Sequence, residues 1–121
     1  MTRDPAIARR FLRPLPSVGI DAPFSLEISE SDGVTVVRVR GDVAYSTCRL
    51  LQDALVPHVA PGRRVVLDFS EVVLLDSSGI GVVLRARQAL VEVAGDLVLR
   101  NPTPSTLRVL EVTGLKDLLV E

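Results

Sequence analysis

Ser77 and Ser78 stand together between an aspartate and a glycine. An apolar run that ends at Leu75 precedes them and another begins at Ile80, a pattern that predicts a strand passing through a polar turn into a helix. Hydroxyls at such a turn lie beside backbone N–H groups without helical partners and beside the positive end of the helix dipole. A phosphate can therefore be accepted there, changing the local charge with little change in fold.

These serines lack the neighbours that a catalytic nucleophile requires. A nucleophilic serine needs a base within hydrogen-bond reach, and the only histidine, His58, belongs to another predicted helix with no evident partner to orient it. The chain has no Gly-x-Ser-x-Gly elbow. We therefore expect no catalytic residue and no enzyme activity. The plainest alternative is structural, with Asp76 or Ser77 serving only as the N-cap of the helix.

The composition limits the kinds of partner. A chain of 121 residues with 47% apolar side chains suggests one domain, and because aromatics make up only 3% its core must be aliphatic. The 14 basic and 15 acidic side chains nearly cancel, which argues against direct binding of nucleic acid. With one cysteine and one histidine, we expect neither a disulfide nor a metal site, and no cofactor.

The first 22 residues differ from the remainder of the chain. They hold four arginines and several prolines, and we interpret 1–22 as a flexible N-terminal extension before a domain at 23–121. The alternative is a docking arm or a cap over the sheet edge. No secretory apolar stretch follows these arginines, and no apolar run reaches the roughly 18 residues of a membrane span. We therefore expect a cytoplasmic protein without membrane contact.

Hydrophobic periodicity predicts the secondary structure of the first half of the domain. Alternation over 24–28 and over 34–40, separated by a turn at 31–33, predicts an antiparallel hairpin. A helix follows, capped by Ser46 or Thr47 and ending in a loose turn at Pro57. Its apolar stripe consists of Cys48, Leu51, Leu55 and Val59, so Cys48 is expected to pack in the core.

The second half alternates strand and helix. The run over 63–69 predicts a central strand buried on both faces, followed by a helix over 78–94 and a strand over 97–99. Thr103 with Pro104 predicts the start of a last helix, which runs to about Val112 and stops at Gly114. A short strand over 118–120 is expected to close the chain. This alternation indicates an α/β layer fold.

The helix after the serines has two apolar arcs when its residues are placed at 100° intervals. The core-facing arc consists of Gly79, Val82, Val83, Ala86, Leu90 and Val93. The second arc holds Ile80, Leu84 and Val91, with Arg87 among them. It is either an extension of the core contact or an exposed patch that meets another protein. On the second interpretation, a charge at Ser78 would lie at the edge of a hydrophobic interface.

From about residue 24 to 120 the sequence resembles the STAS domain, the anti-sigma factor antagonist family of bacteria. Four stretches carry the resemblance: Val-Arg-Val-Arg-Gly-Asp at 37–42, Val-Val-Leu-Asp-Phe-Ser at 65–70, Asp-Ser-Ser-Gly-Ile-Gly-Val-Val-Leu at 76–84, and Arg-Val-Leu-Glu-Val-Thr-Gly-Leu at 108–115. The resemblance implies an α/β fold with a small mixed β-sheet of four to five strands packed with three to four helices.

The resemblance also implies partner switching. The unphosphorylated antagonist would bind an anti-sigma factor that is itself a serine kinase and so release a sigma factor. The kinase would phosphorylate the serine directly before the glycine of the motif, which is Ser78 here, and a phosphatase would restore binding. The residues expected to support the phosphorylated loop are Asp76, Ser77 and Gly79. Those expected to contact the partner are Asp42 and, from the second apolar arc of the helix, Ile80, Leu84 and Arg87. The resemblance does not decide whether the protein also forms a homodimer.

One position departs from the family pattern. The family often reads Gly-Glu-Leu-Asp after the second strand, whereas this chain keeps an acid at Asp42 and has Ala44 in the last place. Binding without the usual phosphorylation is one consequence to test. The alternative function is a non-catalytic STAS adaptor or scaffold in a stress-signalling or transporter-associated complex.

Overall fold

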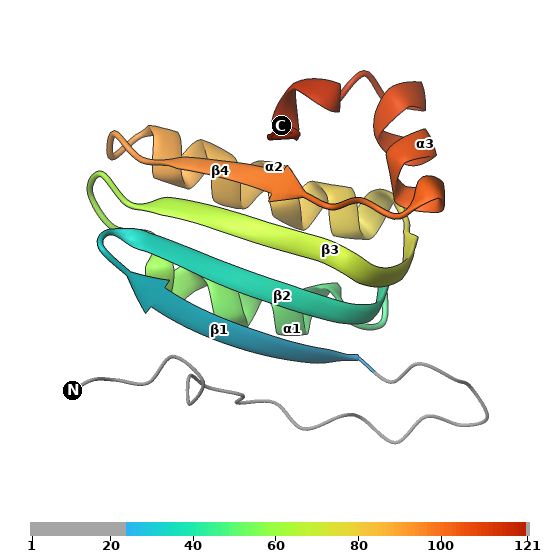
Figure 1. The fold of residues 1–121 in the computed structure, drawn as a ribbon, viewed down its shortest axis with the longest axis horizontal. Coiled ribbons are helices and arrows are strands. Elements are labelled where there is room, and N and C mark those ends of the chain that lie inside the picture. Colours follow the sequence, from blue (N-terminus) through green and yellow to red (C-terminus); the bar gives the residue numbers. More distant parts are fainter. Residues whose placement is uncertain (1–23, 121) are drawn as a thin grey trace.

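A computed structural model describes residues 24–120, so the predicted extension at 1–22 lies outside the described residues. A four-stranded sheet has the order β1-β2-β3-β4, and α1 and α2 lie behind it in Figure 1. The elements are β1 (Ser25–Ser31), β2 (Val34–Val43), α1 (Cys48–Leu55), β3 (Arg64–Leu75), α2 (Ser77–Val91), β4 (Asp96–Arg100) and α3 (Pro104–Val112), with 3-10 turns η2 (Val56–His58) and η3 (Lys116–Leu118). This confirms the predicted mixed α/β fold.

The first two strands form the predicted antiparallel hairpin. Asp32 and Gly33 connect them, and both have positive φ angles, 49° and 80°. Two such residues give the tight turn whose twist matches that of paired strands. The first strand is longer than predicted, because pairing with β2 continues to Ser31.

The strands β2, β3 and β4 are parallel, and a helix makes each crossover between them. The core between the sheet and the helices is mainly aliphatic, as the composition predicts, with Phe24 and Phe69 as its aromatic side chains. Cys48 packs against this core, which confirms its expected role.

The central strand extends well beyond the predicted end at Phe69. It continues to Leu75, which pairs with Val43, and at each of two register shifts β3 carries one residue more than β2. The polar pair at 70–71 resembles a turn in sequence. In the structure, Glu71 accepts a hydrogen bond from Nε of Arg40 at 2.7 Å, so this polar pair stays within the sheet.

Two predictions of local structure were wrong. Thr47 occupies the N-cap position of α1, but its side chain makes no capping bond. Its hydroxyl instead donates to the carbonyl of Asp42, five residues earlier in the same loop, at 2.6 Å. At the C-terminus, η3 and a single bridge between Leu99 and Leu119 replace the predicted strand. The turn at Pro57 and the Thr103 cap with Pro104 are confirmed.

Candidate functional site

The turn between β3 and α2 is organised by the carboxylate of Asp76. Asp76 has extended backbone angles, and its Oδ1 accepts the N–H groups of Ser78 at 2.9 Å and Gly79 at 3.1 Å. This is N-cap geometry, so the structural role offered for Asp76 is confirmed. The helix therefore begins at Ser77, one residue earlier than predicted, and ends at Val91, before Ala94 with its positive φ of 64°.

The same residue joins this turn to the loop between β2 and α1. The backbone N–H of Tyr45 donates to Oδ2 of Asp76 at 3.2 Å, and the N–H of Asp76 donates to the carbonyl of Val43 at 3.2 Å. Both carboxylate oxygens of Asp76 thus accept hydrogen bonds, Oδ1 from the start of α2 and Oδ2 from the loop between β2 and α1. Sequence reasoning missed Tyr45, and the available signal was an aromatic residue directly after the family-like stretch ending at Ala44.

Gly79 permits a close approach between α2 and β2. A Cβ atom at this position would lie 2.6 Å from Cγ1 of Val43 and would also meet the Val43 carbonyl oxygen. No side chain fits at such distances without movement of the neighbouring backbone. Gly79 therefore has a packing reason to be glycine, and this packing holds the helix start against the end of β2.

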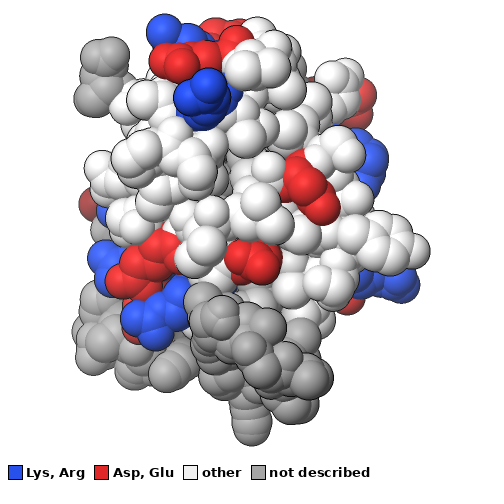
Figure 2. All heavy atoms as spheres, turned by 90° about the vertical axis from the view of Figure 1, so that its right-hand side faces the viewer, with Lys and Arg blue, Asp and Glu red and all other residues white. Residues whose placement is uncertain are grey.

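The hydroxyls lie at the surface end of this assembly. Ser77 is exposed and Ser78 is partly exposed, so neither residue is buried in the core. Tyr45 is 82% exposed and Leu74 is 48% exposed on the adjoining segments. Figure 2 views this end of the molecule and shows a largely uncharged surface with scattered acidic and basic side chains.

The residues predicted to contact a partner do not all lie together. Asp42 pairs with Leu74 next to the turn. Ile80 packs against the core, so the second apolar arc of α2 is partly an extension of the core contact. Leu84 remains 37% exposed, about 9 Å along the helix from Ser78 at 1.5 Å per residue.

Arg87 lies further along α2 and has acidic neighbours within the chain. Its Nε is 3.6 Å from Oδ1 of Asp96, and a terminal guanidinium nitrogen is 4.0 Å from Oδ2 of Asp117. The side chain is therefore directed toward β4 and η3. At about 13 Å along the helix axis from Ser78, it is separated from the serine turn.

His58 also has a partner that the sequence did not indicate. Its Nδ1 lies 2.8 Å from Oε2 of Glu30 on β1. This pair lies near the start of β3, whereas Ser78 follows its end. The histidine is therefore not placed to serve as a base for either serine.

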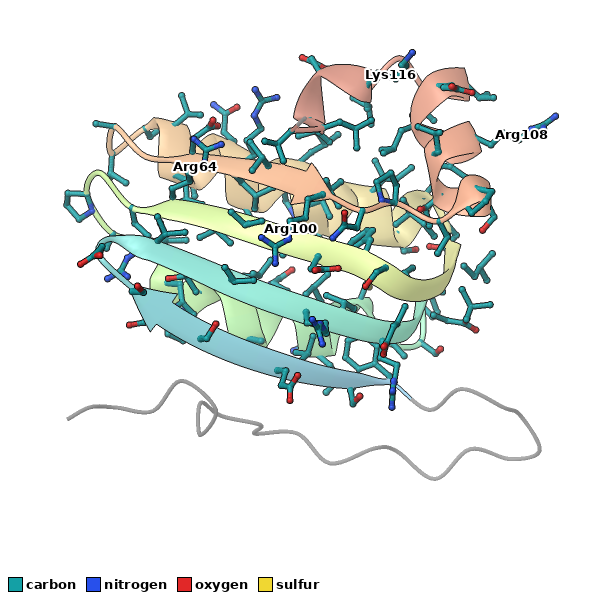
Figure 3. The ribbon with its side chains drawn as sticks, viewed as in Figure 1. Arg64, Arg100, Arg108 and Lys116 are labelled. Carbon is teal, nitrogen blue, oxygen red and sulfur yellow. The ribbon has the colours of Figure 1, made fainter. Side chains whose placement is uncertain are left out.

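A second carboxylate, Asp68, is buried on the sheet face opposite α1 and α2. Burial raises its pKa, but hydrogen bonds from Ser70, Arg100 and Asn101 outweigh that effect and hold the pKa below its usual value. The shortest of these bonds is 2.9 Å, from the Ser70 N–H to Oδ1, and Arg100 Nε lies 3.2 Å from Oδ2. Figure 3 shows Arg100 lying over this face. This cluster ties β3 to β4.

Residues 24–120 contain neither a candidate metal site nor a helix that could span a membrane. No group of three or more histidine, cysteine, aspartate or glutamate side chains in this part of the chain could hold a metal ion. None of its helices has the length and apolar character needed to cross a lipid bilayer.

Comparison with known proteins gives consistent matches across the domain. A family model described as "Mlab, STAS domain" matches residues 26–121. The anti-sigma-B factor antagonist of Listeria monocytogenes is 33% identical over 98 residues, covering 79% of this chain and 86% of the relative.

Solved structures agree with this match. An anti-sigma factor antagonist from Mycobacterium paratuberculosis is 28% identical with a TM-score of 0.69, covering 79% of this chain and 82% of that one. SpoIIAA in its unphosphorylated form gives a TM-score of 0.68 at 22% identity, covering 78% and 85% of the two chains. SpoIIAA of Bacillus in its phosphorylated form gives 0.62 at 24% identity, covering 80% and 88%.

Proposed function

The chain belongs to the STAS domain family, and from this premise we propose that it is an anti-sigma factor antagonist whose partner is exchanged when Ser78 is phosphorylated. The relatives named above as anti-sigma factor antagonists support the binding role. The observation that carries the proposal for this chain is the partly exposed Ser78, set in the first turn of a capped helix at an end of the molecule with only scattered charges.

In the unphosphorylated state this surface binds an anti-sigma factor of the serine kinase type, and the bound kinase releases a sigma factor. Asp42, Leu84 and the exposed side chains around the serine turn supply the contact. A surface with few charges is suited to this role, because little hydration must be removed from ionised groups when the partner docks.

The kinase partner supplies a nucleoside triphosphate as the phosphoryl donor. A bond forms between Oγ of Ser78 and the γ-phosphorus, and the bond from that phosphorus to the β–γ bridging oxygen breaks. The nucleoside diphosphate leaves, and the hydroxyl proton passes to a base of the kinase. A phosphatase reverses the modification by hydrolysis, which returns the serine hydroxyl and inorganic phosphate.

The modification changes binding much more than it changes folding. It adds about −1.5 to −2 charges at the helix start, where the dipole and the backbone N–H groups favour negative charge. An unpaired charge in a desolvated interface costs about 2–5 kcal/mol. At about 1.4 kcal/mol per tenfold change, the affinity for the partner falls by roughly 30- to 4,000-fold. Partners can therefore be exchanged without unfolding.

The test is to incubate the purified full chain with each candidate anti-sigma kinase from its own genome and ATP, and to locate any phosphate by mass spectrometry. A Ser78→Ala variant is the control for site, and Ser77→Ala is the matched control one residue away. We expect modification of the wild type and of Ser77→Ala only. Modification at another residue, or none with any kinase that binds, would contradict the switch and favour an adaptor role.

A further inference from the structure

The carboxylate of Asp76 connects the serine turn to a loop that comes from a distant part of the sequence. Its Oδ1 accepts the Ser78 N–H at 2.9 Å, and its Oδ2 accepts the Tyr45 N–H at 3.2 Å. A change at Ser78 that moves this carboxylate therefore also alters the hydrogen bond that it accepts from the Tyr45 N–H.

Tyr45 is the most exposed large hydrophobic residue in the described part of the chain. The residue is 82% exposed although its backbone N–H is held by Asp76. Aromatic residues make up only 3% of the sequence, so such exposure is not a consequence of abundance. Tyrosine is enriched among residues that dominate binding energy, because it buries a large rigid surface at small entropic cost.

We propose that Tyr45 is the aromatic anchor for the anti-sigma partner, and that Asp76 is a positioning residue that couples this anchor to the charge on Ser78. The inference rests on the proposed function and extends it to a second segment of the chain. In the unphosphorylated protein, Asp76 holds the Tyr45 backbone against the serine turn, so that the ring and the serine hydroxyl form one docking surface.

Phosphorylation weakens this coupling in two ways. The phosphate repels the neighbouring carboxylate, since both carry negative charge within the first turn of α2. The phosphate oxygens also compete with Oδ1 of Asp76 for the N–H groups of Ser78 and Gly79. The carboxylate then turns away from the helix start, the Tyr45 N–H loses its acceptor, and the ring is no longer pre-positioned.

The anchor also indicates the chemistry of the partner. The phenol ring requires a pocket with apolar walls, and its hydroxyl requires a hydrogen-bonding group or water at the end of that pocket. The exposed Leu74 lies on the adjoining strand end and adds apolar contact. The partner is therefore a protein with an aromatic-accepting pocket beside its kinase active site.

The coupling can be tested without the partner, by measuring hydrogen exchange of the Tyr45 amide with NMR. The protein is prepared with phosphoserine incorporated at position 78, and a second preparation carries it at position 77 as the matched control. We expect exchange at Tyr45 to quicken at least tenfold with phosphoserine at 78 and to change less than threefold with phosphoserine at 77. Unchanged exchange at 78, or equal acceleration at both positions, would overturn the coupling.

Asp76→Asn tests the same link from the other side. An asparagine has a single acceptor oxygen. At the helix start that oxygen accepts two N–H groups, from Ser78 and Gly79, whereas at Tyr45 it would accept one, so it stays with the helix and the Tyr45 N–H faces the side-chain NH2. We expect rapid exchange of the Tyr45 amide with the circular dichroism of the fold retained. Protection equal to that of the wild type would show that Asp76 does not position Tyr45.

The anchor role is tested by calorimetry with the anti-sigma kinase found in the phosphorylation experiment. We expect Tyr45→Ala to weaken binding by about 30-fold or more, the loss typical of an energetic hot spot, and Tyr45→Phe to stay within about tenfold. Val112→Ala, at a residue 78% exposed on α3, is the control and should not change affinity. Unchanged affinity of Tyr45→Ala would refute the anchor.

The outcomes separate this inference from the function on which it rests. If phosphorylation of Ser78 abolishes binding while Tyr45→Ala binds normally, the switch stands and the anchor is wrong. If no kinase binds or modifies the chain, the proposed function and the anchor both fail. The exchange measurements still decide whether Ser78 and Tyr45 are coupled.

Discussion

Replacing Gly79 with alanine tests the packing on which the whole site depends. The added Cβ would lie 2.6 Å from Cγ1 of Val43 and would meet the Val43 carbonyl, which belongs to the backbone and cannot rotate away. Overpacking of this kind costs about 1–3 kcal/mol. The gain of about 0.5–1 kcal/mol that alanine usually brings to a helix offsets only part of this cost. We expect net destabilisation.

Gly81→Ala is a matched control on the same helix. Its Cβ would come within 3.2 Å of a terminal nitrogen of Arg85, which is the far end of a flexible side chain. That side chain can move, so Gly81→Ala should be neutral or more stable by up to about 1 kcal/mol. Both variants are compared with the wild type by urea denaturation, with the slope of the transition checked for two-state behaviour. Equal midpoints for the two variants would refute the close approach of α2 to β2.

Three further predictions concern the exposed Leu84 on α2, the buried carboxylate of Asp68 and the exposed Tyr45. Leu84→Asp should abolish binding of the anti-sigma partner in calorimetry while the circular dichroism spectrum is retained, and an unfolded variant would place Leu84 in the core instead. Because the folded pKa of Asp68 is lowered, the stabilising effect of its carboxylate is fully present above the ordinary pKa of 3.8 and is lost as the pH falls below that value through the folded pKa. Asp68→Asn should therefore be less stable than the wild type at pH 7. The difference between their free energies of unfolding, measured by denaturation, should narrow below about pH 4, and a difference independent of pH would contradict this. In the isolated protein tyrosine fluorescence comes from Tyr45 alone, because the chain has one tyrosine and no tryptophan. Its anisotropy should fall when position 78 carries phosphoserine and the ring is released, and equal anisotropy of the two forms would contradict the coupling.

The sequence predicted the features that depend on neighbouring residues. The hairpin turn at Asp32 and Gly33, the Thr103 cap and the N-cap option at Asp76 are local chemistry, and the structure confirms them. The serine turn was placed correctly, because an apolar strand followed by an N-cap and an apolar helix leaves few alternatives.

The missed features depend on residues far apart in the chain. The end of β3 was predicted too early because Ser70 and Glu71 look like a turn until Arg40 is placed beside them. The bond from Tyr45 to Asp76 joins positions 31 residues apart, and no local pattern predicts it. Thr47 is a different case, since the carbonyl that accepts from its hydroxyl belongs to Asp42, only five residues earlier, and lies there because of the path of the loop between β2 and α1.

The most direct test of the central proposal is the affinity of the anti-sigma kinase for the full chain with serine or phosphoserine at position 78, measured by calorimetry at one salt concentration. We predict a loss of affinity between roughly 30- and 4,000-fold on phosphorylation, with the fold unchanged by circular dichroism. Equal affinity of the two forms would contradict the proposal that charge at Ser78 exchanges the partner.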